Sequence, residues 1–282
     1  MIEAKIIAHS ANRYGKEIAT FELQYPRFIH GEVMTHRVFS RNAMSSRAVP
    51  VQKMIDQVRG NPAMPLKFMK NRPGMQSTED FGPLDAVTVE DIWREAADSA
   101  ASYAERLTRM NVHKQFANRV LEPFQWMRAI VTATEWDNFF ALRCHPDAQP
   151  EFQALANLMR ATLIDSTPVI RDEPDCSAKT QASWHLPYVT QMERDIYRDD
   201  LLPKLSAARC ARVSYLTHDG AVPNVEADLA LFDRLVGSVP LHASPIEHQA
   251  TPNVYGGCSG SSNNFKGWRQ FREFYRAADV SK

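Results

Sequence analysis

The sequence predicts a mixed α+β fold, arranged as a single domain with peripheral extensions. Apolar and polar residues alternate over 18–25, which is typical of a strand, and apolar residues recur with helical spacing over 89–110. No shift in composition divides the 282 residues into separate domains, and a chain of this length can bury a large core without disulfides or a metal. We therefore expect one domain over 1–282, with insertions near 60–88 and 166–200.

The first part of the chain is predicted to hold two strands, a helix and a long loop. A short strand over 4–10 precedes the strand over 18–25, which we expect to be buried on one face. Pro26 can begin a helix, because its fixed φ angle suits the first helical position. The residues that this helix would carry include Ile29, Val33, His36 and Arg37. The stretch 60–83 is rich in glycine and proline, and long loops of this kind are often functional or mobile.

Helices and one further strand are predicted for the middle of the chain. The stretch 89–110 is the clearest helix, 116–124 is predicted to be helical up to Pro123, 130–134 is a candidate strand, and 136–143 is predicted to be helical. The next helix is expected to be capped by Asp147, to have Pro150 in its first turn, and to turn Phe152, Leu155, Ala156, Met159 and Leu163 inward.

The last third begins with a polar, poorly periodic stretch over 166–200, which we interpret as an excursion from the fold. Periodicity and capping residues predict order beyond it. The predicted elements are a helix over 201–214, a helix over 224–236 that Asn224 caps and Gly237 ends, a Gly/Ser loop over 256–262, and an amphipathic terminal helix around Trp268, Phe271 and Tyr275.

Composition excludes several classes of protein. Lys plus Arg and Asp plus Glu both number 33, so the net charge is zero, which disfavours a generally basic nucleic-acid binder. No stretch approaches eighteen apolar residues, so no membrane span is expected, and the first residues lack the pattern of a signal peptide. The cysteines are far apart, which argues against a zinc ribbon or a disulfide scaffold and favours a reducing, cytoplasmic setting. They are Cys144, Cys176, Cys210 and Cys258.

The densest polar cluster is the stretch 35–47, Thr-His-Arg-Val-Phe-Ser-Arg-Asn-Ala-Met-Ser-Ser-Arg. Arginine forks match phosphate oxygens, and serine hydroxyls with backbone N–H groups can complete a cradle for an anion. An isolated run of this composition is usually a solvated loop. Phe39 and Met44 interrupt it, however, and this favours a segment that partly faces inward.

A second cluster runs over 119–151 and centres on Arg143, which follows four apolar residues at 139–142. A partly buried arginine needs either a carboxylate partner or an anionic ligand. Both interpretations remain open from the residues alone: an ion pair with Asp147 or Glu151, or a binding role.

The third cluster is Leu-His-Ala-Ser-Pro-Ile-Glu-His over 241–248. Its two histidines and one glutamate suggest a metal, but the spacing is not that of a zinc motif and we find no third ligand. The alternative is a helix start in which Ser244 is the cap, Pro245 the first residue and Glu247 the other half of a capping box.

Familiar motifs for nucleophiles and dinucleotides are missing from the sequence. It holds no Gly-x-Ser-x-Gly, no Walker loop and no Gly-x-Gly-x-x-Gly after a strand, and the glycines at 256–260 are too loosely spaced to count. Any flavin or nucleotide must therefore be held by a pocket of another kind. Cys144 adjoins an apolar run, which favours an inert thiol over an activated one.

The three clusters together resemble the flavin-dependent thymidylate synthases. That family has the signature Arg-His-Arg-x-x-Ser-x-Asn-Glu-x-Ser-x-Arg, which the stretch 35–47 matches except at Thr35 and Ala43. The second cluster is similar to the family's downstream block through Arg119 to Pro123, Asn138, Arg143 and Ala148-Gln149-x-Glu151. The third is similar to its Gly-His-x-Ser/Thr-Pro-x-Glu-His block, and 211–215 to its Ala-Arg-Val-Ser segment.

The order of these segments resembles a circularly permuted relative. In the family, the Ala-Arg-Val-Ser and His-x-Ser-Pro-x-Glu-His segments precede the signature, whereas here they follow it by some 200 residues. The stretch 17–26 is similar to the strand that follows them in the family. Such a rearrangement is plausible because the ends of a domain often lie close together.

The resemblance implies a central antiparallel sheet flanked by helices, assembled as a homotetramer with sites shared between subunits. It implies that a methylene group passes from methylenetetrahydrofolate to carbon 5 of dUMP, that FADH2 supplies hydride, and that NADPH recharges the flavin, without a cysteine nucleophile. No metal, nucleic acid or membrane is implied as a partner.

The resemblance also implies roles for individual residues. The flavin would be contacted by His36, Arg37, Asn138, His242, Ser244 and Glu247. The nucleotide would be bound by Glu32, Ser45, Arg47, Arg119 and Arg143. Among these, Arg143 would be catalytic, because it would stabilise the ionised imide of the pyrimidine.

Departures from the family pattern leave alternatives open. Thr35 replaces an arginine, Ala43 a glutamate and Glu32 a frequent glutamine, while Thr132 and Thr134 stand where the family usually has Asn and Arg. The chain could therefore methylate or hydroxymethylate another pyrimidine nucleotide, or it could be a nucleotide-binding relative that has lost catalysis.

Overall fold

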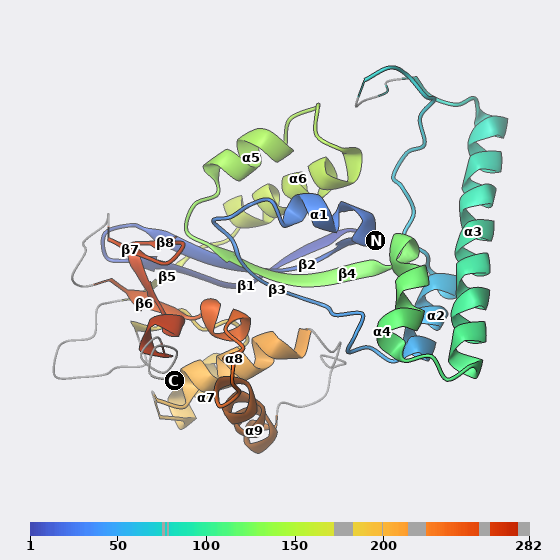
Figure 1. Cartoon of the computed structure of the whole chain (residues 1–282). Helices are drawn as coiled ribbons and strands as arrows, with labels where there is room; N and C mark the ends of the chain where they lie inside the picture. The colour runs from blue at the N-terminus through green and yellow to red at the C-terminus, as the bar shows by residue number, and fades with distance from the viewer. Residues whose placement is uncertain are drawn as a thin grey trace.

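The structure, a computed structural model, describes residues 1–74, 77, 79–171, 183–198, 200–213, 224–253 and 260–275. A five-stranded sheet runs through the middle of the molecule, with helices above, below and to one side (Figure 1). Its strands are β1 (Glu3–Asn12), β2 (Glu17–Pro26), β3 (Ser40–Ala43), β4 (Trp126–Ala133) and β5 (Val169–Arg171). Their order across the sheet is β3-β4-β2-β1-β5.

Most of this sheet is antiparallel. The pairs β1–β2, β2–β4 and β3–β4 are antiparallel, and only the short edge strand β5 runs parallel to β1. The expectation of an α+β fold with a central antiparallel sheet flanked by helices is therefore confirmed. The prediction that the strand over 18–25 is buried on one face is wrong, since most of β2 is buried on both sides because helices or loops cover each face of the sheet.

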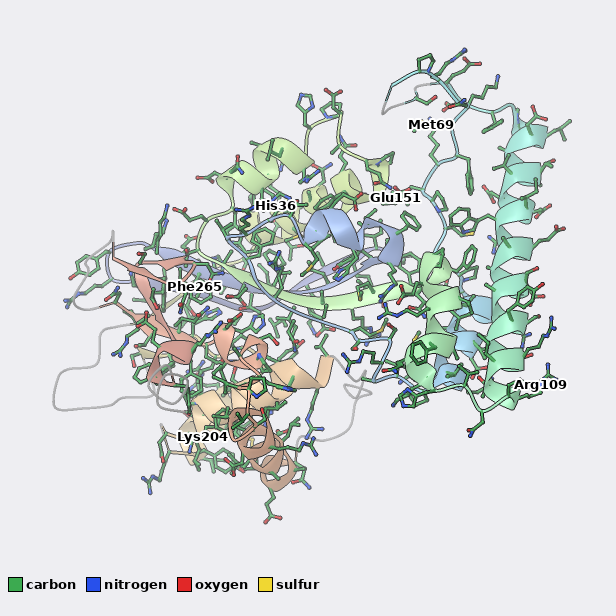
Figure 2. The ribbon with its side chains drawn as sticks, in the orientation of Figure 1. His36, Met69, Arg109, Glu151, Lys204 and Phe265 are labelled. Atoms are coloured by element: carbon green, nitrogen blue, oxygen red, sulfur yellow. The ribbon has the colours of Figure 1, made fainter. Side chains whose placement is uncertain are left out.

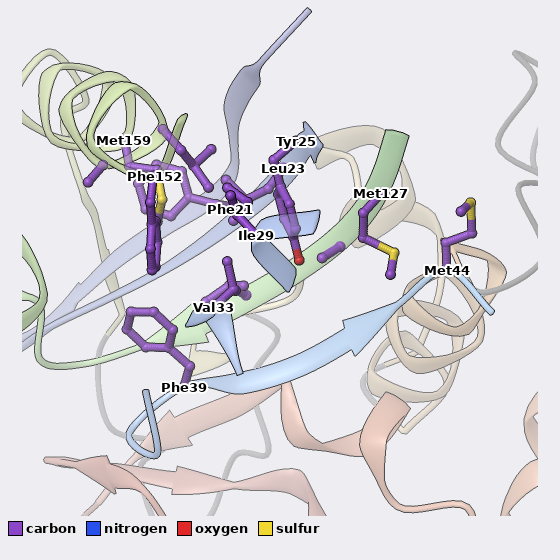
Figure 3. Packing of buried hydrophobic residues seen from close by; sticks show 14 of the residues in the cluster. Phe21, Leu23, Tyr25, Ile29, Val33, Phe39, Met44, Met127, Phe152 and Met159 are labelled. Carbon is purple, nitrogen blue, oxygen red and sulfur yellow. The ribbon is translucent and has the colours of Figure 1, made fainter. Parts of the chain in front are cut away.

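The face of the sheet toward α5 (Asp137–Arg143) and α6 (Pro150–Ile164) holds the main apolar core (Figure 3). Phe21, Leu23 and Tyr25 of β2 point to this side, and Phe152 and Met159 of α6 pack onto it. Alternate residues of a strand share a face, which is why this set recurs at every second position. Because a fully buried side chain of this kind contributes about 1.5–3 kcal/mol, this core fixes α5 and α6 against the strands.

Three helices form a separate layer at one end of the sheet (Figure 1). They are α2 (Val51–Gly60), α3 (Pro83–Arg109) and α4 (Lys114–Ala117), and α4 continues into the 3₁₀ helix η2 (Asn118–Phe124). The predicted helix over 89–110 thus begins six residues earlier than expected, at a proline that suits a first turn. The predicted loop after residue 60 is confirmed over its described residues.

The opposite face of the sheet is covered by the C-terminal part of the chain (Figure 1). This part comprises α7 (Gln191–Ile196), α8 (Leu202–Arg212), α9 (Val225–Val236), the 3₁₀ helices η5 (Ser244–Glu247) and η7 (Phe271–Tyr275), and the short strands β6 (Ala250–Pro252), β7 (Ser261–Ser262), β8 (Phe265–Lys266) and β9 (Trp268–Gln270). The cap of α9 is confirmed, since the Asn224 side chain accepts from the Ala227 N–H at 3.0 Å.

A chain of buried hydrogen bonds joins this part to the sheet. His185 is bonded to Ser10 at 3.0 Å and to Thr20 at 2.8 Å. Thr20 is bonded to Thr132 at 2.7 Å, and Thr132 to Nδ1 of His248 at 2.8 Å. Burial lowers the pKa of His248 to about 3, so this histidine is neutral. These hydrogen bonds let polar side chains fill an interior layer, and Nε2 of His248 is the atom of this hydrogen-bond chain that is buried without a partner among the described residues.

Three predictions about local elements are wrong. The helix after Pro26 is a 3₁₀ turn, η1 (Arg27–Ile29), followed by α1 (His30–Val33); it ends before His36, and strand β3 follows. Asp147 does not cap α6, because Gln149 directly precedes the Pro150 that begins the helix.

The predicted terminal helix is the third error. Its first part is strand β9, in which Trp268 pairs with Pro252 of β6, and only η7 is helical. Further predictions lie outside the described residues: Cys176, Cys258, the Ser214-Tyr215 pair, and the larger part of the Gly/Ser loop.

Candidate functional site

The signature segment, residues 35–47, forms one edge of the sheet through strand β3, and about half of its side chains are buried. Strand β3 pairs with β4, and within it Ser40 and Asn42 are buried while Phe39 and Met44 join the apolar core. Asn42 donates from Nδ2 to the Cys210 carbonyl at 2.7 Å, which ties the segment to α8. The expectation that this polar run partly faces inward is confirmed.

A cavity of about 480 Å³ opens beside this segment. Two residues expected at the flavin, His36 and Asn138, both line it. Aromatic side chains of α5 and the residue preceding it form its walls, namely Trp136, Phe139 and Phe140. Ligand sites are typically concave and about 300–1,000 Å³, so this cavity has the size of one, and its lining combines an aromatic wall with polar and charged side chains.

His36 and Arg143 meet beside the cavity. Nε of Arg143 donates to Nε2 of His36 at 3.0 Å, and Nη2 donates to Oγ1 of Thr35 at 3.4 Å. The guanidinium carbon lies 4.5 Å from the centre of the Phe152 ring. Burial lowers the pKa of His36 to about 4, and the nearby Arg143 adds to this effect.

Among the described residues, Arg143 does not form the ion pair with Asp147 or Glu151 that was the alternative to a binding role. Glu151 accepts from the Leu66 N–H at 2.7 Å and from Gln149 at 3.1 Å. Figure 2 shows His36 and Glu151 in the layer of α1, α5 and α6 above the sheet.

The residues expected at the nucleotide phosphate form a second group, around a carboxylate. Glu122 accepts at Oε1 from Arg119 at 2.8 Å, from Arg27 at 2.7 Å and from Ser46 at 3.0 Å. Arg47 is exposed, and Ser45 accepts from its backbone N–H at 3.3 Å. Asn118 holds this loop by donating to the carbonyls of Ser46 and Val49, so Ser45 and Arg47 are fixed near η2.

The third cluster lies on the other side of β3. Ser244 donates to Asn42 Oδ1 at 3.4 Å, and Glu247 forms an ion pair with Arg272. The capping box predicted for Ser244 and Glu247 is wrong, because η5 has Ala243 at its N-cap and no side-chain cap. Both side chains are engaged elsewhere, and a 3₁₀ turn of four residues leaves little for a cap to stabilise. His242 is exposed next to this turn.

The remaining predicted site residues are on the surface between these groups. Arg37 is exposed and Glu32 is half-buried, and the Glu32 carbonyl accepts from Thr35 Oγ1 at 2.7 Å. The structure thus places His36 and Asn138 in the lining of the cavity, with Arg143 against His36, and it places Ser45, Arg47 and Arg119 in or beside the loop that η2 holds. It does not place His242, Ser244 and Glu247 in the lining of the cavity.

Two functional details escaped the sequence analysis. Glu122, which binds Arg119, stands three residues after it, and that spacing on a helical turn could have indicated the pair. Lys16 lines the cavity through the β1–β2 turn, and it lies too far from any cluster in the sequence to be singled out.

No group of three His, Cys, Asp or Glu side chains suited to a metal is found among the described residues. Of the two cysteines that the structure describes, Cys144 is half-buried and Cys210 is buried, and burial raises the pKa of the Cys210 thiol. Within the described part of the chain, no helix is long and apolar enough to cross a membrane.

Fold and site together define an α+β protein whose arginine-rich sheet edge adjoins an aromatic cavity, an arrangement suited to an anionic, planar ligand. Residues 16–169, more than half of the chain, match the family model described as thymidylate synthase complementing protein. The chain belongs to this family. The matched range contains the first two clusters and ends before the third.

Solved structures of similar fold include a UMP/dUMP methylase, PolB from Streptomyces cacaoi, bound with 5-Br UMP; the identity is 19%, the TM-score 0.48, and the match covers 58% of this chain and 88% of that one. Another is Thymidylate Synthase X from Helicobacter pylori with FAD and dUMP, at 16% identity and a TM-score of 0.38, covering 52% of this chain and 67% of that one. No curated protein matches the sequence.

Proposed function

We propose that this protein is a flavin-dependent thymidylate synthase, which methylates dUMP at carbon 5 with methylenetetrahydrofolate as the one-carbon donor and NADPH as the reductant. The observation that carries the proposal is the meeting of Arg143 and His36 at the aromatic cavity. In a chain of this family, a cation that no described carboxylate pairs with thus contacts His36, a residue lining the cavity that we assign to the flavin.

The cavity lining suits the ring system of FAD. A flat aromatic group is favoured by Trp136, Phe139 and Phe140, while His36 and Asn138 supply polar contacts. When bound, reduced FAD supplies the hydride that turns the transferred methylene into a methyl group. The protein's part is to bind and orient the ligands and to exclude water from the reacting atoms.

Arg143 supplies the electrostatic part of the mechanism. Negative charge develops on the pyrimidine imide as carbon 5 becomes nucleophilic, and a fixed guanidinium nearby stabilises it. Its described partners, His36 and Thr35, are neutral, so no carboxylate of the described residues competes with the ligand for the guanidinium. Arg47 and Arg119, with Ser45, bind the phosphate, where the anion competes with Glu122 for Arg119.

A flavin site shared between subunits would explain why some of the residues expected at the flavin lie apart from the cavity. His242, Ser244 and Glu247 lie across β3 from the cavity in one chain, so we infer that a second protomer of a homotetramer completes each flavin site with Arg37 or with these residues.

An absorption spectrum of the purified protein, before and after addition of FAD, is the first test. A flavin spectrum that remains after gel filtration supports the proposal, and no binding at all overturns it. The second test is oxidation of the reduced, flavin-loaded protein on mixing with dUMP and methylenetetrahydrofolate, followed by detection of dTMP. A flavoprotein that produces no methylated product would not be a thymidylate synthase.

A second candidate is methylation of a different pyrimidine nucleotide. Thr35 and Ala43 favour it, since they replace a charged donor and a charged acceptor at the nucleotide edge. A panel of dUMP, UMP and dCMP under identical single-turnover conditions decides between them by which nucleotide gains mass.

A further inference from the structure

Arg143 is held by uncharged groups. Its Nε donates to His36 at 3.0 Å, its Nη2 donates to Thr35 at 3.4 Å, and its guanidinium lies over the Phe152 ring at 4.5 Å. No carboxylate of the described residues forms an ion pair with it. A half-buried guanidinium without a counter-ion is costly to maintain, so its partners must be arranged to keep it in place.

The direction of these hydrogen bonds fixes the state of His36. Arginine can only donate, so Nε2 of His36 must accept, and the imidazole must be neutral with its proton on Nδ1. Burial, then the positive charges of Arg143 and Arg41, lower the pKa of His36 to about 4, which agrees with this state. Stacking on Phe39 and edge contacts with Phe139 and Phe152 hold the ring plane.

Thr35 is oriented in the same way. Its hydroxyl donates its one proton to the Glu32 carbonyl at 2.7 Å, so the oxygen lone pairs are left to accept from Arg143. An arginine at position 35, as in the family signature, could not accept a hydrogen bond and would add a second positive charge. Threonine at this position therefore creates a contact to Arg143 that the signature residue cannot make.

We propose that Thr35 and His36 are positioning residues for Arg143, and that Arg143 in turn fixes His36 as the Nδ1-protonated tautomer. This inference rests on the proposed function for its catalytic consequence, but not for its structural part. His36 lines the cavity, and its Nδ1–H has no hydrogen-bond partner among the described residues, so it is a donor for a carbonyl or ring nitrogen of a planar heterocycle.

The charged groups around the pair leave the charge of Arg143 unpaired. Arg41 lies on β3, and Asp137 stands at the far end of α5 from Arg143. Around the cavity, Glu135 is paired with Lys16 at 3.4 Å and with Lys266 at 2.5 Å. Glu17 is paired with His9 at 3.3 Å. Glu135 is thus engaged with two lysines and Glu17 with His9, while Asp137 also lines the cavity.

Nitrogen-15 NMR of histidine-labelled protein tests the structural part without any ligand. We expect the His36 signals, assigned by their loss in His36→Gln, to report a neutral Nδ1–H tautomer at pH 7 and still at pH 5. In Arg143→Leu the tautomer should no longer be fixed. A His36 that is protonated on Nε2 in the wild-type protein, or that titrates near pH 6.5, would overturn the proposal.

Kinetics of the flavin-loaded protein test the positioning role. Thr35→Val keeps the shape of the side chain and removes the acceptor, so we expect kcat to fall about tenfold with a smaller change in KM. Thr35→Ser should restore most of kcat, and Arg106→Lys, an arginine over the Tyr103 ring outside the site, is the matched control. Equal kcat in Thr35→Val and wild type would refute the role of Thr35.

The two tests separate the inference from the proposed function. If the wild-type protein has the Nδ1–H tautomer but does not methylate dUMP, the arrangement of Arg143 stands and the function is wrong. If it methylates dUMP while His36 carries its proton on Nε2, the function stands and the positioning role falls.

Discussion

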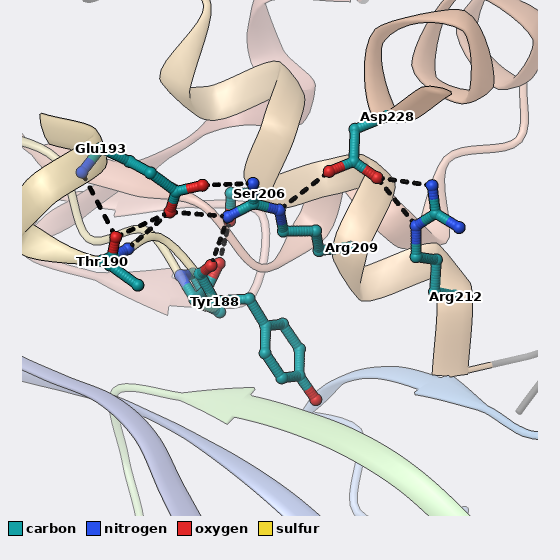
Figure 4. A network of polar contacts seen from close by, with 8 residues as sticks. Tyr188, Thr190, Glu193, Ser206, Arg209, Arg212 and Asp228 are labelled. Carbon is teal, nitrogen blue, oxygen red and sulfur yellow. Dashed lines mark hydrogen bonds and ion pairs between the residues drawn. The ribbon is translucent and has the colours of Figure 1, made fainter. Parts of the chain in front are cut away.

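Two arginines of this molecule show opposite solutions to burying a positive charge. Arg209 of α8 is 4% exposed and lies between two carboxylates: it donates to Asp228 at 2.9 Å and forms an ion pair with Glu193 (Figure 4). It also donates to the Tyr188 carbonyl at 2.7 Å. Arg143 of α5 is half-buried and has a neutral imidazole, a hydroxyl and an aromatic ring as its partners.

The difference separates an arginine whose charge is neutralised by carboxylates from one that we propose to be functional. Around Arg209, carboxylates neutralise the charge and join α7, α8 and α9, and Arg212 extends the network by donating to Asp228 at 2.8 Å. Nothing is left for a ligand to bind. Around Arg143, the charge is positioned but not neutralised, so an anionic ligand gains the interaction that a carboxylate would otherwise have.

The largest expected effect is on stability, from Arg209→Met. Removing the guanidinium takes from Glu193 and Asp228 the cation that they share in a buried site, and breaking a buried ion pair typically costs about 3–5 kcal/mol. Urea unfolding should show this loss, with a much smaller loss for the more exposed Arg212→Met. If Arg209→Met unfolds at the wild-type midpoint, the network does not hold the helices together.

The next effect is on rate, from Arg143→Lys. Lysine keeps the charge but cannot donate to His36 and Thr35 with the same planar geometry. We expect turnover to fall roughly a hundredfold or more, as for a lost donor to a developing anion, while the protein stays folded and keeps its flavin. Melting temperature and single-turnover flavin oxidation are measured on one preparation. A destabilised variant with normal turnover would assign Arg143 to the structural class with Arg209.

Periodicity and capping residues predicted β2, the second half of β4, most of α3 and the cap of α9, because these depend on neighbours in the sequence. The contact between His36 and Arg143 joins residues 107 positions apart, and it depends on how α5 packs over the sheet. Local patterns cannot supply such a pairing, which is why the sequence left the partner of Arg143 open between carboxylate and ligand.

Other failures have a tertiary cause as well. Ser244 and Glu247 have the spacing of a capping box, but Asn42 and Arg272 are better partners for them in the folded chain. The segment around Trp268 has an apolar pattern that fits either a helix or a strand. Its pairing with β6 makes it a strand. The resemblance of the second cluster to the family's downstream block implied a role for Arg143, whereas its neutral surroundings could be seen only once the fold was known.

A smaller effect should appear in binding, at an intermediate case in which Arg119 and Arg27 share one carboxylate, Glu122, and Arg47 is exposed nearby. Arg47→Ala removes a charge-assisted contact, so the affinity for dUMP should fall about ten- to hundredfold while that for deoxyuridine is unchanged. Isothermal titration measures both, with the exposed Arg160→Ala as the control. Equal weakening for nucleotide and nucleoside would mean that Arg47 does not bind phosphate.

The two arginine sites should also differ in their response to acid. His36 has its pKa lowered to about 4, so its contribution to stability is present above the unfolded value near 6.5 and is lost as the pH falls from about 6.5 toward 4. Burial tends to raise the pKa of Glu193, but hydrogen bonds from Arg209 outweigh it and lower the pKa, so this contribution is lost only below about 4.5.

His36→Gln tests this difference, since glutamine can still accept but does not titrate. Between pH 6.5 and 4 the free energy of unfolding of the variant should fall less steeply with pH than that of the wild type. The two slopes can differ by at most about 1.4 kcal/mol per pH unit, which corresponds to the uptake of one proton. Urea titrations at a series of pH values give both slopes. Parallel slopes would mean that His36 has the same protonation in the folded and unfolded protein over this range.

The smallest effects concern a coincidence of sequence: each of the two arginines is followed by a cysteine, Cys144 and Cys210. Cys210 is completely buried, and burial raises the pKa of its thiol, while Cys144 is half-buried beside the proposed site.

A reactive thiol needs a lowered pKa and access to solvent, and Cys210 has neither, so we expect it to contribute to packing only. Cys210→Ser should cost some stability because it places a hydroxyl in an apolar site, whereas Cys144→Ser should cost little. Replacing all four cysteines with Ala or Ser should leave turnover within an order of magnitude if the protein folds. Loss of the single-turnover step in a folded Cys144→Ser protein, with Cys210→Ser unaffected, would show that a thiol next to Arg143 takes part in the chemistry.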